Sequence, residues 1–359
     1  VVRKRRGRKE ACEALSSSEE SVVVMGDGEY VKVHLHTRDR ESTRKGLAAS
    51  GDILQWSDDN LETQTAAFQG LLKQQAIHIM TDAAGSLTRE DAQKRGITLL
   101  DSYITVGGTS LPETCFAPSE IYAAMRKGIR VTTSQASDAE RHHWYQQALS
   151  LSKQVLYLCV GSGFTGNHTA ALQWKNNFDP DNRMLVMDTQ AASGSLGVLA
   201  ITTAQHAKGN AQPHEVVAFA REAAGRCGEY IFIDTLKYLA AGGRLSTTGA
   251  FFGDMLHMKP VISPGAGGAK KVGVVRNSED QIRFALQKLA KALSPDGSPL
   301  IMLEYSDNRE WVESRAAQEV QKRYPSAEML IKPLSLTTGV HTGPGTWAVA
   351  YVAEKGRSA

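Results

Sequence analysis

The chain has 359 residues, of which 42% are hydrophobic and 22% are charged, as in soluble globular proteins with two or three domains. No apolar run approaches the roughly 18 residues that cross a bilayer, and no apolar segment follows the basic amino terminus. We therefore expect a cytoplasmic protein without an integral membrane segment.

Residues 1–9 carry six of the 41 Lys and Arg, which leaves 35 basic against 38 acidic residues and a body charge of −3. This balance argues against a nucleic-acid partner, and residues 1–9 are expected to form a solvated end.

The amino-terminal segment predicts a small α/β module over residues 1–60. Residues 21–37 read as two strands joined by Gly26-Asp27-Gly28, a hairpin signal. His34 and His36 then project from one face of the second strand, where two imidazoles can share a metal ion or form the polar face of a half-buried sheet. Asp39 is placed to cap a short helix, and the polar residues 61–76 are expected to link this module to the remainder.

Residues 77–190 predict a first lobe, because apolar strands alternate with amphipathic helices. We expect strands at 77–80, 97–106, 155–160 and 184–188, and helices at 86–96, 118–128, 138–151 and 167–178. This order is typical of a parallel sheet covered by helices, with binding residues at the carboxyl ends of the strands. The residues expected at those ends are Thr81, Asp82, Thr132, Thr133 and Ser162.

The stretch 131–137 (VTTSQAS) is rich in hydrogen-bonding groups. Thr132, Thr133, Ser134 and Ser137 lie together before the helix expected from Asp138. One hydroxyl is enough to cap that helix, so four suggest donors around a carboxylate or a phosphate.

Residues 191–359 predict a second lobe. Two helices follow each other first, and strands and helices then alternate irregularly up to the apolar strand TWAVAYV. This order favours an α/β lobe with a mixed sheet.

Several short segments carry a family resemblance. The segments GSGFTGN at 161–167 and HTGPG at 341–345 combine with IHIMTDAAGSLT and LKYLAAGGRLSTTGAFFGDMLHMKPVI. Together they resemble the DegV family of bacterial lipid-binding proteins from about Ile77 to Val352. The resemblance implies a two-lobed fold that holds a long-chain fatty acid, needs no cofactor, and presents the carboxylate to a fatty acid kinase.

The resemblance also assigns residues to roles. Ser162 matches the serine that binds the ligand carboxylate, and His341 matches the ligand-binding histidine. With Thr132 or Thr133 they would replace the hydration of a buried carboxylate, whose loss costs several kcal/mol. Ser134 and Gly163 belong to the same strand-end loops, and Arg244 matches an arginine that faces the kinase.

This chain departs from the family pattern at two positions. Ala83 follows the Thr-Asp pair where the family commonly has a serine, and Gly161 replaces a second serine. Both changes remove a donor.

A second resemblance covers about Glu13 to Asn60, which is similar to the middle domain of fatty acid kinases. In that family the two histidines of the strand join an upstream cysteine in binding zinc, which implies zinc at His34 and His36. Cys12 does not match the position of that cysteine. The match leads us to expect a kinase domain before Val1, and hence a kinase partner in the same chain; otherwise the kinase would be a separate one.

An alternative interpretation starts from Gly161 to Gly166, which spells G-x-G-x-x-G between a strand and a helix, with Asp188 at the end of the next strand. These are parts of a dinucleotide site, and a nucleotide-dependent α/β enzyme is the competing hypothesis. No nucleophile–base pair or Walker-type loop is evident, so we expect binding rather than catalysis. His142 and His143 are expected to be solvated.

Overall fold

The computed structural model describes residues 2–4, 20–25, 30–37, 39–53, 76–209, 211–241 and 258–354. The chain divides into two compact units, residues 1–66 and 67–359. The two units are described separately below.

The first unit contains a four-stranded antiparallel sheet in the order β2-β3-β1-β4. Its elements are β1 (Val2–Lys4), β2 (Glu20–Met25), β3 (Tyr30–His36), α2 (Arg40–Ser50) and β4 (Gly51–Ile53). The predicted strand pair and helix are confirmed, and the side chain of Asp39 caps α2 by accepting from the backbone N–H of Ser42. Within the segment expected to form a solvated end, Val2–Lys4 forms a strand whose backbone pairs with β3 on one side and β4 on the other.

The second unit begins with the predicted parallel sheet, in the order β11-β10-β5-β6. Its strands are β5 (His78–Asp82), β6 (Ile97–Leu100), β10 (Val155–Cys159) and β11 (Met184–Asp188). The two central strands, β5 and β10, are buried along their whole length, as expected for strands covered on both faces. The helices that contact this sheet are α4 (Arg89–Arg95), α6 (Asp138–Leu151) and α7 (Asn167–Phe178), whereas α5 (Pro118–Arg126) packs away from it.

The single strand expected at 97–106 is wrong. The chain breaks at Asp101 and Ser102, so that β6 joins the parallel sheet and β7 (Tyr103–Val106) joins a separate one. This second sheet is three-stranded and antiparallel, and it contains β7, β8 (Thr109–Pro112) and β9 (Val131–Ser134). The break is stabilised by the carboxylate of Asp101, which accepts from the guanidinium of Arg89 and from the backbone N–H of Thr114.

The hydroxyl-rich stretch is therefore a strand, and it does not lie at the carboxyl end of a parallel strand as expected. Ser137 alone caps the following helix, by accepting from the backbone N–H of Glu140. Thr132, Thr133 and Ser134 have no capping role because their backbone pairs with β7.

The predicted mixed sheet has six strands in the order β14-β13-β12-β17-β15-β16. Only β15 and β16 are parallel to each other; the other neighbouring strands are antiparallel. The strands are β12 (Cys227–Phe232), β13 (Lys259–Ser263), β14 (Lys270–Val275), β15 (Leu300–Tyr305), β16 (Glu328–Pro333) and β17 (Trp347–Val352). The helical elements are α8 (Ser193–Lys208), α9 (Pro213–Ala224), α10 (Lys237–Ala241), α11 (Ser278–Ala292), α12 (Arg309–Trp311), a π-helical turn (Val312–Ala316), α13 (Ala317–Arg323) and α14 (Leu336–Thr342).

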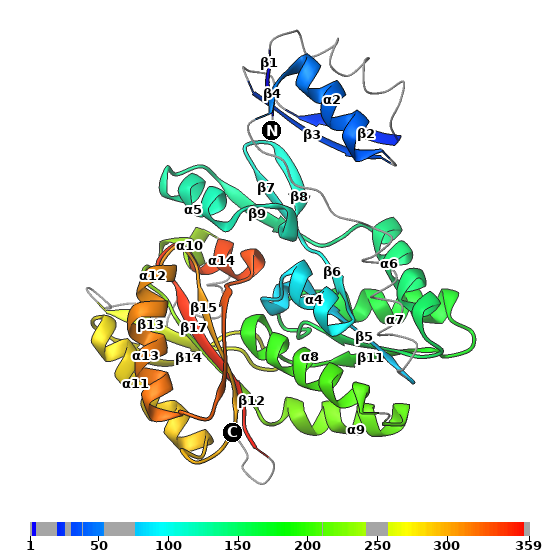
Figure 1. Cartoon of the computed structure of the whole chain (residues 1–359). Coiled ribbons are helices and arrows are strands. Elements are labelled where there is room, and N and C mark those ends of the chain that lie inside the picture. The colour runs from blue at the N-terminus through cyan, green and yellow to red at the C-terminus, as the bar shows by residue number, and fades with distance from the viewer. Residues whose placement is uncertain are drawn as a thin grey trace. The chain divides into compact units, whose positions relative to one another are not determined.

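Helix α8 lies between the parallel sheet and the six-stranded sheet (Figure 1). Twelve of its sixteen residues are buried, and its side chains join one apolar cluster that contains Leu158 of β10 and Met302 of β15. Glycine allows the close approach, because a Cβ atom on Gly197 would overlap the carbonyl oxygen of Gly85. The two sheets therefore share a core through this helix.

Candidate functional site

Thr133 and His341 are brought together. The hydroxyl of Thr133 on β9 lies 3.1 Å from Nε2 of His341 on α14. Both side chains are half-buried, so each remains accessible to a ligand while part of its surface is desolvated. A hydroxyl and an imidazole at this distance can both donate to one carboxylate.

His341 occupies the last turn of a helix that the sequence did not predict. Ser335 caps α14 by accepting from the backbone N–H of Thr338, and Leu336 and Val340 pack in an apolar cluster with Tyr122 of α5. The helix ends at Gly343, whose φ of +88° lies in the left-handed region. These contacts fix the position of the imidazole.

Ser162 is engaged within the chain. Its hydroxyl donates to Oδ2 of Asp188 at 2.6 Å, and its backbone N–H donates to Oδ1 at 3.0 Å. Partial burial favours a higher pKa for Asp188, but the hydrogen bonds from Ser162 and from the backbone N–H of Gln190 outweigh it and hold this pKa below the usual value. Asp188 is thus ionised at neutral pH. The nucleotide interpretation would have Asp188 bind a ribose, but here its carboxylate accepts hydrogen bonds from Ser162.

The loop that carries Ser162 lies against two other segments. A Cβ atom on Gly163 would lie 2.6 Å from the backbone nitrogen of Gly268, in the turn before β14, and one on Gly166 would lie 3.2 Å from the amide of Gln135, just after β9. The loop from Gly161 to Gly166 therefore meets both the segment after Thr133 and the six-stranded lobe.

The surroundings of Gly161 leave no room for a side chain. A Cβ atom at this position would lie 2.8 Å from the backbone of Gln190, in the loop after β11. The backbone N–H of Gly161 also donates to the carbonyl oxygen of Ala191 at 2.8 Å. A side chain here would require that loop to move.

Thr81 and Asp82 lie at the carboxyl end of β5, as expected, and both are fully buried. The hydroxyl of Thr81 donates to the carbonyl oxygen of Leu158. Asp82 accepts from the hydroxyl of Tyr157, the backbone N–H of Val160 and the amide of Asn167. Burial raises the pKa of Asp82 to about 6, against the opposing effect of these hydrogen bonds. The two residues hold the strand ends on which the loop of Ser162 is built.

The other expected site residues are distributed as follows. Thr132 is half-buried on β9, next to Thr133, and Ser134 and Gly163 are exposed. Ala83 is buried in a short 3-10 turn. His34 and His36 lie on β3, but their side chains, like the whole of Arg244, lie outside the described residues. Within the described part of the chain, no group of three or more His, Cys, Asp or Glu side chains is placed to hold a metal ion.

The expectation of two solvated histidines is wrong for His142. Its Nδ1 accepts from the indole N–H of Trp174 at 2.9 Å, and its ring meets that of Phe178 edge to face. Helices α6 and α7 pack against each other through this contact, whereas His143 is exposed.

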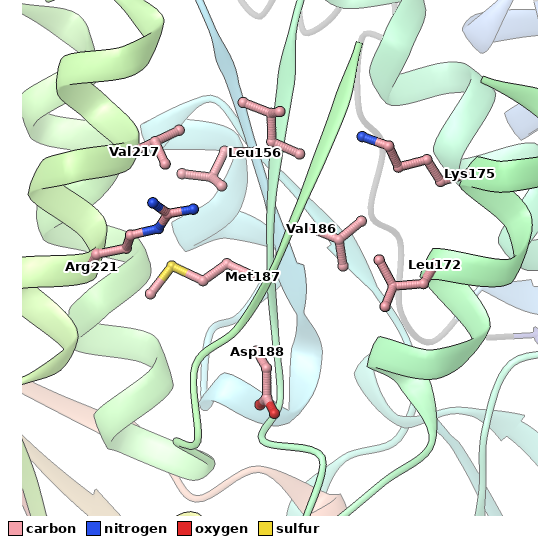
Figure 2. A pocket seen from close by; sticks show the side chains of 9 residues that line it. Leu156, Leu172, Lys175, Val186, Met187, Asp188, Val217 and Arg221 are labelled. Atoms are coloured by element: carbon pink, nitrogen blue, oxygen red, sulfur yellow. The ribbon is translucent and has the colours of Figure 1, made fainter. Parts of the chain in front are cut away.

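A cavity of about 440 Å³ runs along the edge strand β11 (Figure 2). Most of its lining is aliphatic, and Lys175, Asp188 and Arg221 supply the charges. The lining comes from β10, α7, β11 and α9: Leu156, Leu172, Lys175, Leu185, Val186, Met187, Asp188, Val217 and Arg221. Because Asp188 also holds Ser162, one end of this cavity adjoins the loop of Ser162.

Two carboxyl groups that the fold buries were not identified from the sequence. Glu229 on β12 and Glu304 on β15 are 1% and 0% exposed. Glu229 accepts from the backbone N–H groups of Gly194 and Ser195 at the start of α8, and Glu304 accepts from the hydroxyl of Ser193. Burial raises the pKa of both, and their mutual repulsion adds to the effect at Glu229. The available signal was an acid inside each of two apolar strands, CGEYIF and LIMLEY.

A third buried acid, Glu113, was also missed. It is 4% exposed, and Oε2 accepts from the backbone N–H of Thr337 in the first turn of α14. Burial is the main reason why its pKa is raised to about 7.

The fold and the site define an α/β protein in which two lobes share a helix, and in which polar side chains from distant segments meet between strand ends. Residues 76–354 match the model of the DegV family, and the chain belongs to this family. Residues 2–68 match a second model, the FakA-like middle domain of fatty acid kinases. Both resemblances noted in the sequence are thereby confirmed.

Individual relatives agree with this assignment. A DegV domain-containing protein of Lactococcus lactis is 28% identical over 286 residues, which cover 78% of this chain and 98% of the relative. One of Clostridium perfringens is 25% identical over 283 residues, covering 77% of this chain and 97% of the relative. No helix in the described ranges is long and apolar enough to span a membrane.

Solved structures share the fold. A fatty-acid-binding DegV family protein from Thermus thermophilus superposes with a TM-score of 0.72 at 25% identity, covering 78% of this chain and all of that one. A stearic-acid-binding protein from Eubacterium ventriosum gives a TM-score of 0.68 at 19% identity, covering 77% and 98%. The predicted two-lobed α/β architecture is confirmed.

Proposed function

We propose that this protein binds a long-chain fatty acid, with the carboxylate at Thr133 and His341 and the acyl chain between the two lobes. The observation that carries the proposal is the 3.1 Å contact between these two residues. The Thermus thermophilus relative, which is described as fatty-acid-binding, makes a fatty acid the natural ligand for such a pair.

Ser162 completes the proposed headgroup site, whereas Thr132 lies on the opposite face of β9 from Thr133 and would be the alternative hydroxyl. The loop of Ser162 adjoins the segment that follows Thr133 through Gly166 and Gln135. For Ser162 to donate to a ligand, its hydroxyl must turn away from Asp188, so we propose that the carboxylate of the ligand competes with that of Asp188. Gly163 belongs to the loop of Ser162, and Ser134 is the last residue of β9. Thr81 and Asp82 hold the strand ends on which the loop of Ser162 is built.

The cavity along β11 is the proposed space for the acyl chain, because α7, β10 and β11 of the first lobe line it together with α9 of the second. Burial of each CH₂ group gains about 0.8 kcal/mol, which requires an apolar lining, and six apolar residues line this cavity. A volume of about 440 Å³ lies within the range of roughly 300–1,000 Å³ that is usual for small-molecule sites.

A fatty acid kinase is the proposed partner. One chain carries both a DegV domain and a match to the FakA-like middle domain of fatty acid kinases, which supports a fused arrangement; a separate kinase is the alternative. We propose that Arg244 faces this kinase and that the bound carboxylate is phosphorylated to an acyl phosphate. The protein itself would act as the binding component and not as the enzyme.

Zinc at His34 and His36 remains a prediction. The two backbone positions alternate correctly on β3 to share one face. Elemental analysis of the purified protein tests it, and a content well below one zinc ion per chain would reject it.

The test of the main proposal is to denature the purified protein and identify the released small molecules by mass spectrometry. We expect a long-chain fatty acid at close to one per chain. Recovery of a nucleotide in its place would support the competing nucleotide-dependent enzyme and overturn the proposal. Titration of delipidated protein with oleate should then give saturable one-site binding.

A further inference from the structure

The amino end of α14 is held by two buried acids that come from different parts of the fold. Glu113, from the turn after β8, accepts directly from the backbone N–H of Thr337 at 3.0 Å. Glu304, from β15, acts through Ser86: the hydroxyl of Ser86 accepts from the backbone N–H of Ser335 at 2.9 Å and donates to Glu304 at 2.5 Å.

Both acids are placed where an ionisable group is costly. Glu113 is 4% exposed and Glu304 is fully buried, and a buried carboxyl group destabilises a fold unless its hydrogen bonds compensate. Among the described residues, Oε1 of Glu113 has no hydrogen-bond partner. The hydrogen bond from the backbone N–H of Thr337 in α14 therefore offsets part of the cost of burying Glu113.

The other end of α14 carries His341. The helix has only seven residues, and its middle is fixed because a Cβ atom on Gly339 would overlap the hydroxyl oxygen of Tyr122. A hydrogen bond of 2.7 Å from the backbone N–H of Gly343 to the carbonyl oxygen of Gly339 closes the last turn. A displacement of the amino end must therefore move His341 as well, since two turns of helix behave as one body.

We propose that Glu113 and Glu304 are positioning residues for the headgroup site, because they fix the amino end of α14 and thereby set the place of the His341 imidazole relative to Thr133. The expected effect on fatty-acid binding rests on the proposed function. It adds two residues, remote in sequence from His341, that act through the helix and not on the ligand.

The test uses Glu113→Ala, which removes the acceptor, and Glu113→Gln, which keeps an acceptor oxygen without charge. The exposed Glu120 on the neighbouring helix α5 supplies the matched control, Glu120→Ala. Two quantities are measured on the full chain: the nitrogen chemical shifts of the His341 imidazole in delipidated protein, and the dissociation constant for oleate.

We expect Glu113→Ala to move the His341 shifts and to weaken oleate binding five- to tenfold, Glu113→Gln to restore most of both, and Glu120→Ala to change neither. Ser86→Ala, which breaks the arm from Glu304 while leaving Glu113 in place, should act in the same direction and provides the test if Glu113→Ala fails to fold.

Unchanged His341 shifts in both Glu113→Ala and Ser86→Ala would overturn the positioning role. Shifts that move while oleate affinity stays constant would leave the positioning role standing and would instead overturn the assignment of His341 to the headgroup site.

Discussion

The hydroxyl of Thr133 and Nε2 of His341 lie 3.1 Å apart although 208 positions separate the two residues in the chain. Thr133 belongs to the three-stranded sheet of the first lobe, and His341 belongs to α14, which precedes β17 of the six-stranded sheet in the second lobe. A ligand that binds both residues must therefore bridge segments whose relative position is set by the whole fold.

Thr133→Val removes the hydroxyl with little change in shape, and it should weaken oleate binding about tenfold, since a hydrogen bond to a charged group contributes about 1.5 kcal/mol or more. Isothermal titration of delipidated protein measures this. Thr105→Val is the matched control, because Thr105 is paired with Thr132 on the same sheet, and its hydroxyl donates to that of Ser110, an exposed residue of β8. Equal losses in the two variants would remove Thr133 from the site.

Asp188→Asn should strengthen oleate binding severalfold. It removes a negative charge that is maintained next to Ser162 by the lowered pKa of Asp188, and the amide can donate to the serine hydroxyl, which then turns its own proton to the ligand. Ser162→Ala should weaken binding, and the double variant should resemble Ser162→Ala. If Asp188→Asn has no effect on affinity at low ionic strength, Ser162 does not contact the carboxylate.

Val217→Trp fills the cavity along β11, of which Val217 is a lining residue. We expect it to reduce the affinity for oleate at least fivefold and the affinity for octanoate less, because a shorter chain needs less of the apolar space. Ala218→Trp places the same ring at an exposed position of the same helix and should have no effect. Wild-type affinity for oleate in Val217→Trp would show that the acyl chain takes another path.

The buried pair Glu229 and Glu304 predicts a pH dependence of stability. Burial raises the pKa of both carboxyl groups in the folded state, so the folded protein retains protons that the unfolded chain releases above a pH of about 4.5. The contribution of the pair to the free energy of unfolding is therefore largest at low pH and falls as the pH rises toward the folded pKa values.

Glu229→Gln, which cannot ionise, should flatten this dependence. Urea unfolding at pH 5 and pH 8 measures the change, and the difference between wild type and variant removes the contributions of Asp82 and Glu113, which have the same sign. A variant with the same slope as wild type would show that the pair is ionised in the folded protein.

Gly161→Ser introduces the serine that the family resemblance implies at this position, and it should destabilise this protein by about 1–3 kcal/mol, the usual cost of overpacking. The reason is the 2.8 Å approach of the Gln190 backbone to the position of a Cβ atom. Gly267→Ala is the control, since nothing lies within 4 Å of its Cβ position. A thermal unfolding temperature that is unchanged in Gly161→Ser would mean that the loop after β11 moves freely.

Much of the fold could be predicted from local signals. The bounds of α6, α7 and β11 agree with the sequence patterns, because caps such as Ser137 and short apolar runs act over a few positions. The break at Asp101 could not be predicted, since it depends on contacts with Arg89 and Thr114, which are distant in sequence.

The sequence predicted residues of the candidate site, but it did not predict the elements and hydrogen bonds that position them. His341 was identified by resemblance, but its helix contains threonine and glycine, which are poor helix formers, and forms through contacts with Tyr122 and the buried acids. The bond from Ser162 to Asp188 follows from the parallel pairing of β10 with β11, which places Cys159 opposite Asp188. This bond could be predicted only with knowledge that β10 and β11 are neighbours in the sheet.

Helix α8 limits how a ligand can enter. Its buried residues pack in a core that both sheets share. Gly197 lies against Gly85 in the turn after β5, and Gly194 lies against Ala350 of β17. Swinging the lobes apart as rigid halves would strip this helix from one sheet and expose a large part of the common core. Uptake and release must instead proceed through loops and short helices at the rim, so exchange rates should respond to substitutions there and be insensitive to substitutions along the body of α8.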